Sequence, residues 1–337
     1  MRILFSGGGY YQLINTLKSE GHVVSGFPWT KFDRNRKLWD EFNKTLLRKK
    51  IKNFKPDIFI CAKGFRNNYF IYPDTLSWIK KNVGISIYWS LDDPFVVNSF
   101  IDSNSYIGYK IALSCSTQTF SKYRKVGMDP YLFWPAWDSL INKTPPNVKK
   151  KLDFILVGTP YACTNIPRRL VALWAMRQGM NFAIYGPKSW IEDKVIVDKS
   201  GKPFVQGDAR LEPYYKGYFR NWRKLPELLS SAKLNFSNHV LKAKMYLNDR
   251  VFLVMGPGNA LIMDCNPGIE SVFKHNVEVM FYKNFRTFEH RAKYLLDHDN
   301  YRKEIGKNAR RKILEEHTYK NRAIQLLDIL KKYGFKK

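Results

Sequence analysis

Apolar and polar positions alternate along this chain in a regular way. In the first half, short apolar runs predict buried strands at 2–5, 22–24, 58–61, 85–89 and 111–114. The intervening stretches have apolar residues at three- and four-residue spacing and predict helices at 10–20, 39–54 and 76–81, with a further helix running through Tyr123. Strand and helix in alternation predict an α/β domain, with a mostly parallel sheet covered by helices on both faces.

The same pattern starts again after a change in composition. The run PPNVKKK at 145–151 combines two prolines with lysines, which is typical of a linker. Beyond it the sequence predicts strands at 152–157, 182–185, 233–236 and 260–263, helices at 168–178, 225–231 and 248–255, an irregular excursion at 192–215 and a helical tail over 288–332.

These patterns divide the chain into three parts. They are a Rossmann-like domain at 1–147, a second one at 148–315, and a last helix at 316–337 that packs back toward the first domain. Because ligands of open parallel sheets lie at the carboxyl ends of the strands, we expect two Rossmann-like domains facing across a cleft. A two-domain transferase has this layout, with the donor on one side and the acceptor on the other.

The stretch 248–273 has the features of a ligand-binding loop system. A helix starting after Asn248 would point its positive end at the cleft, with Arg250 adding a guanidinium for a diphosphate. Gly256 and the following Pro-Gly end that helix, and the carboxylate of Glu270 follows the next strand. Glu270 could bind sugar or ribose hydroxyls; the alternative is an ordinary helix N-terminal glutamate favoured by the dipole.

Two adjacent acids follow the strand at 85–89. Asp92 and Asp93 are well placed to take a proton from an acceptor hydroxyl, with Asp93 preferred, and burial would raise one pKa. The alternative is an Asx turn. Further acceptor-side candidates are Gly8, Gly9, Tyr10 and Trp89, for which a tight turn and core packing are the structural alternatives.

Charge is the most unusual property of the composition. The net charge is +28, and the segment 31–55 alone holds ten Lys or Arg against three acids. A second basic concentration runs from Arg302 to Arg322. Such a balance indicates a polyanionic partner, either nucleic acid or an anionic membrane surface. A compositional bias toward Lys, Asn, Tyr and Phe explains part of it.

The sequence gives little support for a disulfide-rich, membrane-spanning or metal-binding protein. The four cysteines form no CxxC pair, which predicts free thiols in a reducing compartment. No stretch of 18 apolar residues occurs and no signal peptide is recognised, so a cytoplasmic protein is expected. No His, Asp or Glu cluster has metal-ligand spacing, and we expect neither a cofactor nor a metal.

Several motifs in sequence order carry a family resemblance. They are NDRVF with MGPG, the loop PGIE at 267–270, His317-Thr318-Tyr319 with Arg322, and Asp92-Asp93-Pro94. Together they resemble GT-B glycosyltransferases, in particular the CgeB-like family of spore-maturation proteins. The resemblance implies a nucleotide-sugar co-substrate and no metal. One departure is Leu253, where the pattern has a glutamate expected to hold the donor ribose.

Pattern and resemblance together predict one set of donor-binding residues. It consists of Gly158, Thr159, Gly186, Lys188, Asn248, Arg250, Gly256, Gly258, Asn259, Gly268 and Glu270. Asp93 or Asp92 is the predicted catalytic base.

The predicted function is transfer of a sugar to a hydroxyl. Since a donor needs only two or three positive charges, the remaining charge points to duplex DNA as the acceptor, modified on a hydroxylated or hydroxymethylated base as some bacteriophages do. One alternative is a transferase for a cell-envelope polymer, glycolipid or protein at an anionic membrane. The other is a non-catalytic DNA-binding protein on a GT-B scaffold, which Leu253 favours.

Overall fold

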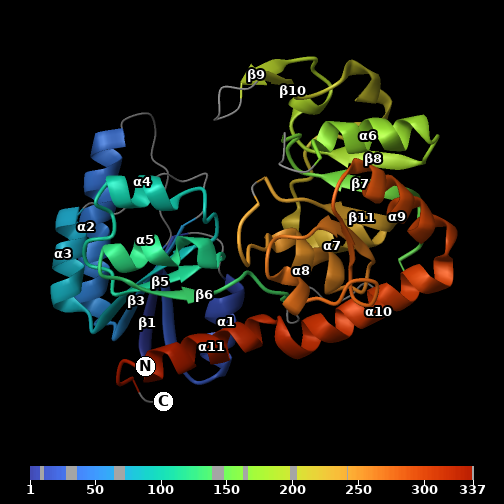
Figure 1. Ribbon diagram of the computed structural model, residues 1–337. Helices are drawn as coiled ribbons and strands as arrows, with labels where there is room; N and C mark the ends of the chain where they lie inside the picture. Colours follow the sequence, from blue (N-terminus) through green and yellow to red (C-terminus); the bar gives the residue numbers. More distant parts are fainter. Residues whose placement is uncertain are drawn as a thin grey trace. The chain divides into compact units, whose positions relative to one another are not determined.

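Two compact units make up the protein. The computed structural model describes residues 1–7, 11–27, 36–63, 73–138, 148–161, 166–197, 203–240 and 242–335. Unit 1 comprises Met1–Ala136 with Tyr319–Lys337, and unit 2 comprises Trp137–Thr318 (Figure 1). Each unit contains one main sheet in which every described pair of neighbouring strands is parallel.

Unit 1 is built on six strands in the order β2-β1-β3-β4-β5-β6. Their bounds are β1 Arg2–Ser6, β2 Val23–Phe27, β3 Ile58–Lys63, β4 Ile85–Ser90, β5 Ile111–Ser114 and β6 Asp129–Leu132. The helices of this unit are α1 Tyr11–Ser19, α2 Arg36–Phe54, α3 Pro73–Asn82, α4 Val97–Asp102, α5 Phe120–Lys125 and α11 Tyr319–Lys331, with the 3-10 turn η1 Thr117–Thr119.

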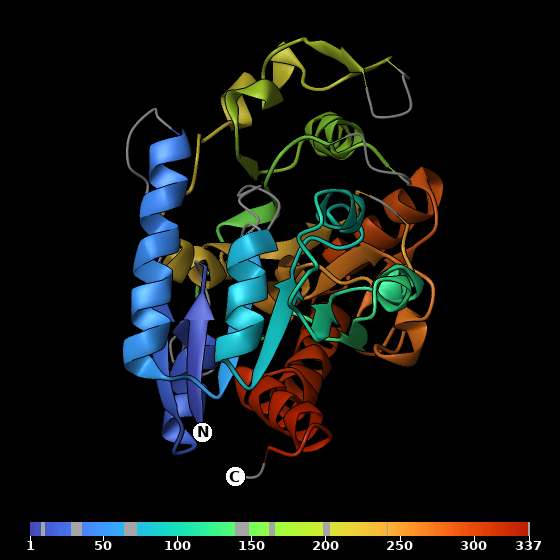
Figure 2. The same cartoon turned by 90° about the vertical axis from the view of Figure 1, so that its left-hand side faces the viewer.

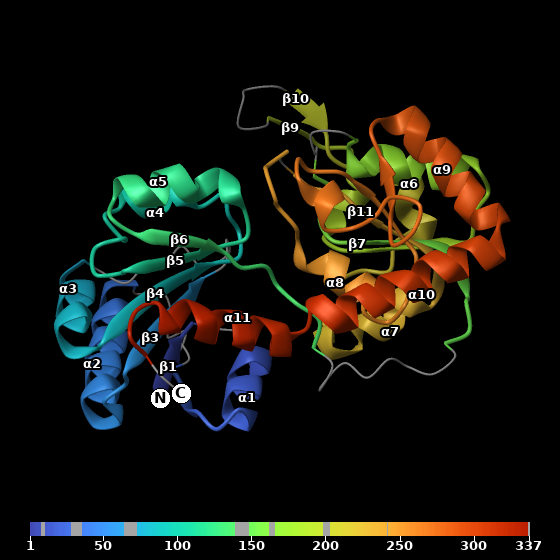
Figure 3. The same cartoon turned by 60° about the horizontal axis from the view of Figure 1, so that its bottom comes forward.

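Strand alternation divides the core of unit 1 between the two faces of its sheet. Ile58 and Trp89 pack with the buried residues of α1 and α11, and Figure 3 shows these two helices side by side. Phe59 and Tyr88, which are the sequence neighbours of Ile58 and Trp89, pack instead with residues of α2 and α3. These two helices lie together in Figure 2. Successive side chains of a strand point to opposite faces of the sheet. A strand whose residues are all apolar therefore contributes to a hydrophobic core on each face.

Unit 2 repeats the plan with five strands in the order β13-β12-β11-β7-β8. Their bounds are β7 Leu152–Val157, β8 Phe182–Tyr185, β11 Ala232–Ser237, β12 Leu261–Asp264 and β13 Met280–Tyr282. The helices are α6 Arg168–Arg177, α7 Leu225–Ser230, α8 Asp249–Met255, α9 Phe285–Asp297 and α10 Asp299–Glu316, with 3-10 turns η2 Lys188–Trp190, η3 Ala209–Tyr214, η4 Trp222–Lys224 and η5 Ile269–Ser271.

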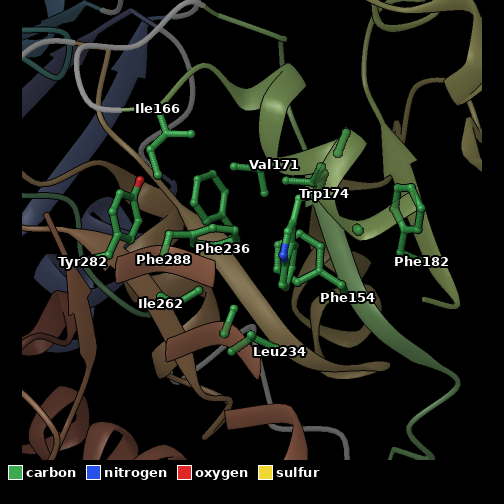
Figure 4. Packing of buried hydrophobic residues seen from close by; sticks show 14 of the residues in the cluster. Phe154, Ile166, Val171, Trp174, Phe182, Leu234, Phe236, Ile262, Tyr282 and Phe288 are labelled. Atoms are coloured by element: carbon green, nitrogen blue, oxygen red, sulfur yellow. The ribbon is translucent and has the colours of Figure 1, made fainter. Parts of the chain in front are cut away.

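An aromatic cluster fills one face of the unit 2 sheet. Figure 4 shows Phe154 and Phe236 from two neighbouring strands against Trp174 of α6 and Phe288 of α9. The Trp174 and Phe288 rings meet edge to face with centroids 5.0 Å apart. Such contacts fix α6 and α9 on the sheet, and so fix the loops that leave its strands.

Two edge strands and one antiparallel pair of strands are absent from the sequence prediction. The region 192–215, predicted to be irregular, contains an antiparallel pair, β9 (Val195–Val197) and β10 (Pro203–Val205). β6 contains Pro130 and lies at a sheet edge, and β13 has only three residues. Whether a short edge segment forms a strand depends on its pairing with a neighbouring strand. The local periodicity of the sequence carries no information about that pairing.

Candidate active site

The carboxyl edge of the unit 2 sheet collects an unusual number of polar groups. Gly158 follows β7, Gly186 follows β8, Asn238 and His239 follow β11, and Asp264 is the last residue of β12. Because the strands are parallel, all these chain ends meet on the same edge. This is the edge where open α/β sheets bind their ligands.

Two arginines converge on Gly158. A Cβ atom built on this glycine would lie 2.8 Å from Nη2 of Arg250 and 3.3 Å from Nη1 of Arg168. The φ angle of Gly158 is +123°, a conformation that a side chain would strain. The absence of a side chain therefore lets two guanidinium groups approach one point of the backbone, an arrangement suited to an anion.

Arg168 is held rigidly in this position. Its Nε donates to Oδ1 of Asn238 at 2.7 Å, and its Nη1 donates to the carbonyl of Thr159 at 2.9 Å. Its Nη2 donates to the carbonyl of Asn238 at 3.1 Å. Arg168 is 7% exposed, so its charge is fixed by the fold at the start of α6 rather than carried on a mobile side chain.

A buried histidine–aspartate pair lies next to this arginine system. Nδ1 of His239 is 2.8 Å from Oδ1 of Asp264, and the backbone N–H of His239 donates to the same carboxylate. The carboxylate accepts, so Nδ1 carries a hydrogen and the other ring nitrogen, Nε2, faces away from Asp264. That buried Nε2 has no hydrogen-bond partner among the described residues. Buried polar atoms without partners are uncommon and mark candidate ligand contacts.

The loop after β12 presents the predicted carboxylate. Glu270 is exposed in η5, and its Oε2 accepts a hydrogen bond from Cys265 Sγ at 3.4 Å. A hydrogen bond from its own backbone lowers the pKa of Glu270. Burial raises the pKa of Cys265 to about 12, so this thiol stays protonated. Gly268, at φ +89°, contacts Met245 through the space where a Cβ would lie.

The remaining donor-side predictions differ in their surroundings. Thr159 is half-buried, and its carbonyl is used by Arg168. Lys188 is exposed in η2. Gly186 is buried, and a Cβ on it would lie 2.2 Å from the carbonyl oxygen of Gly158, so the two loops touch.

Helix α8 is shorter and less positive at its start than predicted. It has seven residues, begins with the acid Asp249, and its N-cap residue Asn248 makes no capping hydrogen bond. The Asn248 amide instead hydrogen-bonds Ser237 Oγ at 3.2 Å. Leu253, in the position of the missing glutamate, is half-buried on this helix. The helix positions Arg250 but supplies no anion site of its own.

Three predicted donor residues lie at the other end of the strands. Gly256, Gly258 and Asn259 follow the C-terminus of α8 and precede β12, at the amino edge of the sheet. The Asn259 amide donates to Ser230 Oγ at 2.9 Å and accepts from Lys150 at 2.9 Å. Their place is structural, because α8 crosses the sheet from the carboxyl edge to the amino edge, and the structure does not bring these three residues together with Arg250.

In unit 1, the preferred catalytic acid is part of the core. Asp93 is fully buried, and its Oδ2 accepts from Ser114 Oγ at 2.6 Å and Tyr123 OH at 2.8 Å. Burial raises its pKa, against the opposing effect of these hydrogen bonds. Asp93 ties the loop after β4 to β5 and α5 and is not accessible to an acceptor. Its neighbour Asp92 is only half-buried.

The other acceptor-side predictions give no open surface. Trp89 is fully buried and packs edge to face on Phe133 at 5.2 Å, so its role is core packing. Gly8, Gly9 and Tyr10 lie outside the described residues, as does Cys163. Cys61, Cys115 and Cys265 are free thiols.

The two basic segments are partly used by the fold. In 31–55, residues 31–35 lie outside the described ranges, and Lys44 forms an ion pair with Asp74 at 2.6 Å. In 302–322, three arginines donate to backbone carbonyls: Arg302 to Leu295, Arg310 to Gly256 and Arg322 to Trp134. Burial lowers the pKa of Arg322 to about 10. Charge along these segments therefore overstates the charge available to a partner.

Two searches of the described residues give negative findings. They contain no group of three or more His, Cys, Asp or Glu placed to hold a metal ion. In the same part of the chain, every helix is too short or too polar to cross a membrane. That the reaction needs no metal stays a prediction.

Sequence reasoning did not select Arg168 or Asn238 for this site. Both residues lie near the carboxyl ends of strands, where ligands of parallel sheets bind. Asn238 directly follows β11, and Arg168 is the first residue of the helix after β7. Asn238 lies two positions after the predicted strand at 233–236, so it is among the polar residues that follow a predicted strand. The approach of Arg168 to Asn238 spans 70 positions and has no local signal.

Comparison with known proteins agrees with this geometry. Residues 165–328, just under half of the chain, match the model of a family described as Glycosyl transferase-like. The matched segment contains Arg168, His239, Arg250 and Glu270. The match supports glycosyl transfer as the general activity, while membership of the CgeB-like family stays a prediction. No curated protein sequence matches the chain.

Solved structures resemble the protein over nearly its whole length. Sucrose-phosphate synthase from Thermosynechococcus elongatus has a TM-score of 0.67 and 10% identity, covering 98% of this chain and 98% of that one. The Anabaena protein Alr3699/HepE, in complex with UDP-glucose, has a TM-score of 0.62 and 10% identity, covering 98% and 100%.

A third similar structure has a different activity. UDP-GlcNAc 2-epimerase from Neisseria meningitidis, bound to UDP-GlcNAc, has a TM-score of 0.54 and 8% identity, covering 98% of this chain and 100% of that one. At such identities the likeness shows the fold alone. It confirms the predicted α/β fold with two Rossmann-like domains of the GT-B type.

Proposed function

We propose that this protein transfers a sugar from a nucleotide-sugar donor to a hydroxyl acceptor, and that unit 2 binds the donor. The observation that carries the proposal is the convergence of Arg168 and Arg250 on Gly158 at the carboxyl edge of the parallel sheet. Two guanidinium groups at a glycine-lined strand end suit a diphosphate, and the family match over 165–328 supports the same class of reaction.

The donor contacts follow from positions around this point. Arg250 binds the diphosphate, Arg168 adds a fixed positive charge beside it, and the buried Nε2 of His239 is available to one of its oxygens. Glu270, exposed and ionised, accepts hydrogen bonds from ribose or sugar hydroxyls. Thr159, Gly186, Lys188, Asn248 and Gly268 line the same edge and complete the proposed donor set.

The chemical step needs one base and one stabilised leaving group. The acceptor oxygen attacks the anomeric carbon, the bond from that carbon to the phosphate oxygen breaks, and the nucleoside diphosphate leaves with the electron pair. Asp92 takes the acceptor proton, because it is half-buried at the carboxyl end of β4 whereas Asp93 is enclosed. The arginines stabilise the negative charge on the departing diphosphate.

A polyanion is the proposed acceptor, and DNA is our specific choice. The net charge of +28 exceeds what a nucleotide sugar requires, even after the internally bonded arginines are subtracted. We propose a hydroxylated or hydroxymethylated base, which must be flipped out of the duplex or reached in the major groove. A cytoplasmic location and metal-free transfer are parts of the same proposal.

A donor panel tests the proposal directly. The protein is incubated with each nucleotide sugar, alone or with duplex DNA containing hydroxymethylated pyrimidines, unmodified duplex DNA or a glycolipid, and nucleoside diphosphate release is measured. We expect release with one donor and acceleration by the modified duplex only. Release that only a glycolipid accelerates would replace DNA with an envelope acceptor. DNA binding without any release would indicate a non-catalytic binder.

Paired variants test the base. Asp92→Asn should abolish transfer while DNA binding is retained. Asp102→Asn, an exposed acid of the same unit, is the matched control and should transfer normally. Full activity in Asp92→Asn removes this residue from the mechanism.

A further inference from the structure

A short basic and aromatic segment lies beside the candidate donor site. Residues 216–224, KGYFRNWRK, connect η3 to α7 and include η4. The segment has four cations, three aromatic residues, no acid and no aliphatic side chain. None of the predicted site residues lies in this segment.

The beginning of the segment is fixed against β8. The N–H of Lys216 donates to the carbonyl of Ile184 at 2.9 Å, and the N–H of Gly186 donates to the carbonyl of Gly217 at 2.9 Å. The Phe219 ring packs edge to face on Tyr185 at 5.9 Å. Gly186 also touches Gly158, so the segment adjoins the arginine system of the donor edge.

Its other two aromatic rings are presented to solvent. Tyr218 is 57% exposed and Trp222 is 45% exposed, although large aromatic side chains usually fill cores. The guanidinium of Arg223 lies 5.6 Å from the centre of the Trp222 ring. A flat ring with a cation beside it offers stacking and charge at the same point.

All four cations of the segment are exposed, and Nζ of Lys216 donates to the carbonyl of Pro213 at 3.2 Å. The other three, Arg220, Arg223 and Lys224, form no ion pair within the part of the chain that the structure describes. This contrasts with Arg302 and Arg322, whose guanidinium groups are buried on carbonyls. The segment 216–224 is therefore positive surface that a partner can use.

We propose that 216–224 is a binding surface for single-stranded DNA. Unpaired bases stack on Tyr218 and Trp222, while Arg220, Arg223 and Lys224 contact the phosphates between them. Stacking requires unpaired bases, so the surface holds nucleotides outside the duplex. The inference deepens the DNA acceptor of the proposed function and rests on it for its role, but the binding itself needs no donor.

The composition favours nucleic acid over a lipid surface. An amphipathic membrane anchor needs an apolar face of several Trp, Phe or Leu side chains, whereas only the rings of Tyr218 and Trp222 are exposed in this segment. The most exposed aliphatic residues of this unit, Val195 and Val197, lie on β9 instead. They provide a separate variant for testing a membrane.

The experiment measures binding of the full-length protein to a short labelled oligothymidine, by fluorescence anisotropy over a range of salt concentrations. One variant combines Arg220→Gln, Arg223→Gln and Lys224→Gln. Its control removes three exposed cations of unit 1, with Lys80→Gln, Lys81→Gln and Lys125→Gln. A second variant combines Tyr218→Ala with Trp222→Ala.

We expect the triple variant to bind about tenfold or more weakly, with the slope of log affinity against log salt reduced by about two. The aromatic variant should also lose about tenfold, with an unchanged slope, because stacking releases no counterions. The control should bind like the wild type. Wild-type affinity in both segment variants, or stronger binding to duplex than to single strand, overturns the proposal.

Two further measurements separate the possible failures. Binding to phosphatidylglycerol vesicles that is lost in the two segment variants but kept in Val195→Ser with Val197→Ser, without oligonucleotide binding, would assign the surface to a membrane. Transfer to DNA that is unaffected by the segment variants would leave the proposed function standing and reject this surface. Oligonucleotide binding that maps to the segment, without transfer to any DNA, would support this surface and reject DNA as the acceptor.

Discussion

The two units place charged groups at the same edge of similar sheets and use them in opposite ways. At the carboxyl edge of unit 1, Asp93 is enclosed and accepts hydrogen bonds from Ser114 and Tyr123. At the carboxyl edge of unit 2, Arg250 is half-buried over a bare glycine backbone, and His239 keeps a ring nitrogen without a partner among the described residues.

The difference shows what distinguishes a fold contact from a candidate ligand contact. A polar group that the core encloses completely is not accessible to a substrate, and this holds for Asp93 although its Oδ1, like Nε2 of His239, has no hydrogen-bond partner among the described residues. Arg250 and Asp92 are half-buried at the carboxyl edges of their sheets. Accessibility therefore makes Arg250 the better candidate for the proposed diphosphate contact, and Asp92 a better candidate than Asp93 for the proposed base.

The largest expected effect comes from removing the unit 2 charge. Arg250→Ala should lower kcat/KM for the nucleotide sugar about a hundredfold, because one donor to the developing diphosphate charge is lost. Arg177→Ala, an exposed arginine of α6, is the control and should retain full activity. Donor turnover by Arg250→Ala at the wild-type rate would contradict the role of Arg250 at this edge.

The backbone beneath the arginines can be changed next. Gly158→Ala forces a side chain into φ +123° and against Nη2 of Arg250. We expect a loss of about 1–3 kcal/mol of unfolding free energy, together with weaker donor binding because Arg250 must move. Gly179→Ala is a useful control, since that glycine also has positive φ but no atom lies within 4 Å of its Cβ position. Equal donor affinity in the two variants would show that Arg250 does not need the space above Gly158.

The buried carboxyl group of Asp93 in unit 1 should make the unfolding free energy depend on pH. Burial raises the pKa of Asp93 above 3.8, so the folded state binds the proton more tightly than the unfolded chain. Its contribution is therefore greatest at low pH and falls as the pH rises through the folded pKa. Asn does not titrate, so the unfolding free energy of Asp93→Asn should rise relative to that of the wild type as the pH rises through this window.

Denaturant unfolding of both proteins at a series of pH values measures this difference. A difference that stays constant with pH would mean that Asp93 titrates in the folded protein as it does in the unfolded chain. Asp102→Asn again serves as the exposed control, with no pH-dependent difference expected.

The smallest effect concerns the free nitrogen of His239. Asn at this position keeps a donor near Nδ1 for Asp264 and removes Nε2, whereas Gln places its amide nearer to Nε2. We expect His239→Asn to weaken donor binding about fivefold, which corresponds to one ordinary hydrogen bond, and His239→Gln to retain more of the affinity. Calorimetric titration with nucleoside diphosphate measures both, and unchanged affinity in the two variants would make the pair purely structural.

Local pattern was sufficient for most of the elements. The strands at 152–157 and 182–185 have the predicted bounds, and α8 differs from its prediction by one residue at its start. The sequence pattern does not show at which edge of the sheet a residue lies. It put Gly256, Gly258 and Asn259 in one site with Arg250 because they are neighbours in sequence, although a helix separates them.

The amino-acid sequence by itself determined two parallel α/β sheets, the polar residues at their carboxyl ends and an excess of positive charge. Those follow from apolar periodicity and composition, which are local properties of the chain. Only the tertiary structure decided which charges the fold consumes: Asp93, Arg302 and Arg322 are enclosed, while Arg223 and Lys224 stay exposed. Burial depends on contacts between residues far apart in sequence, and the strength of a charge toward a partner depends on that burial.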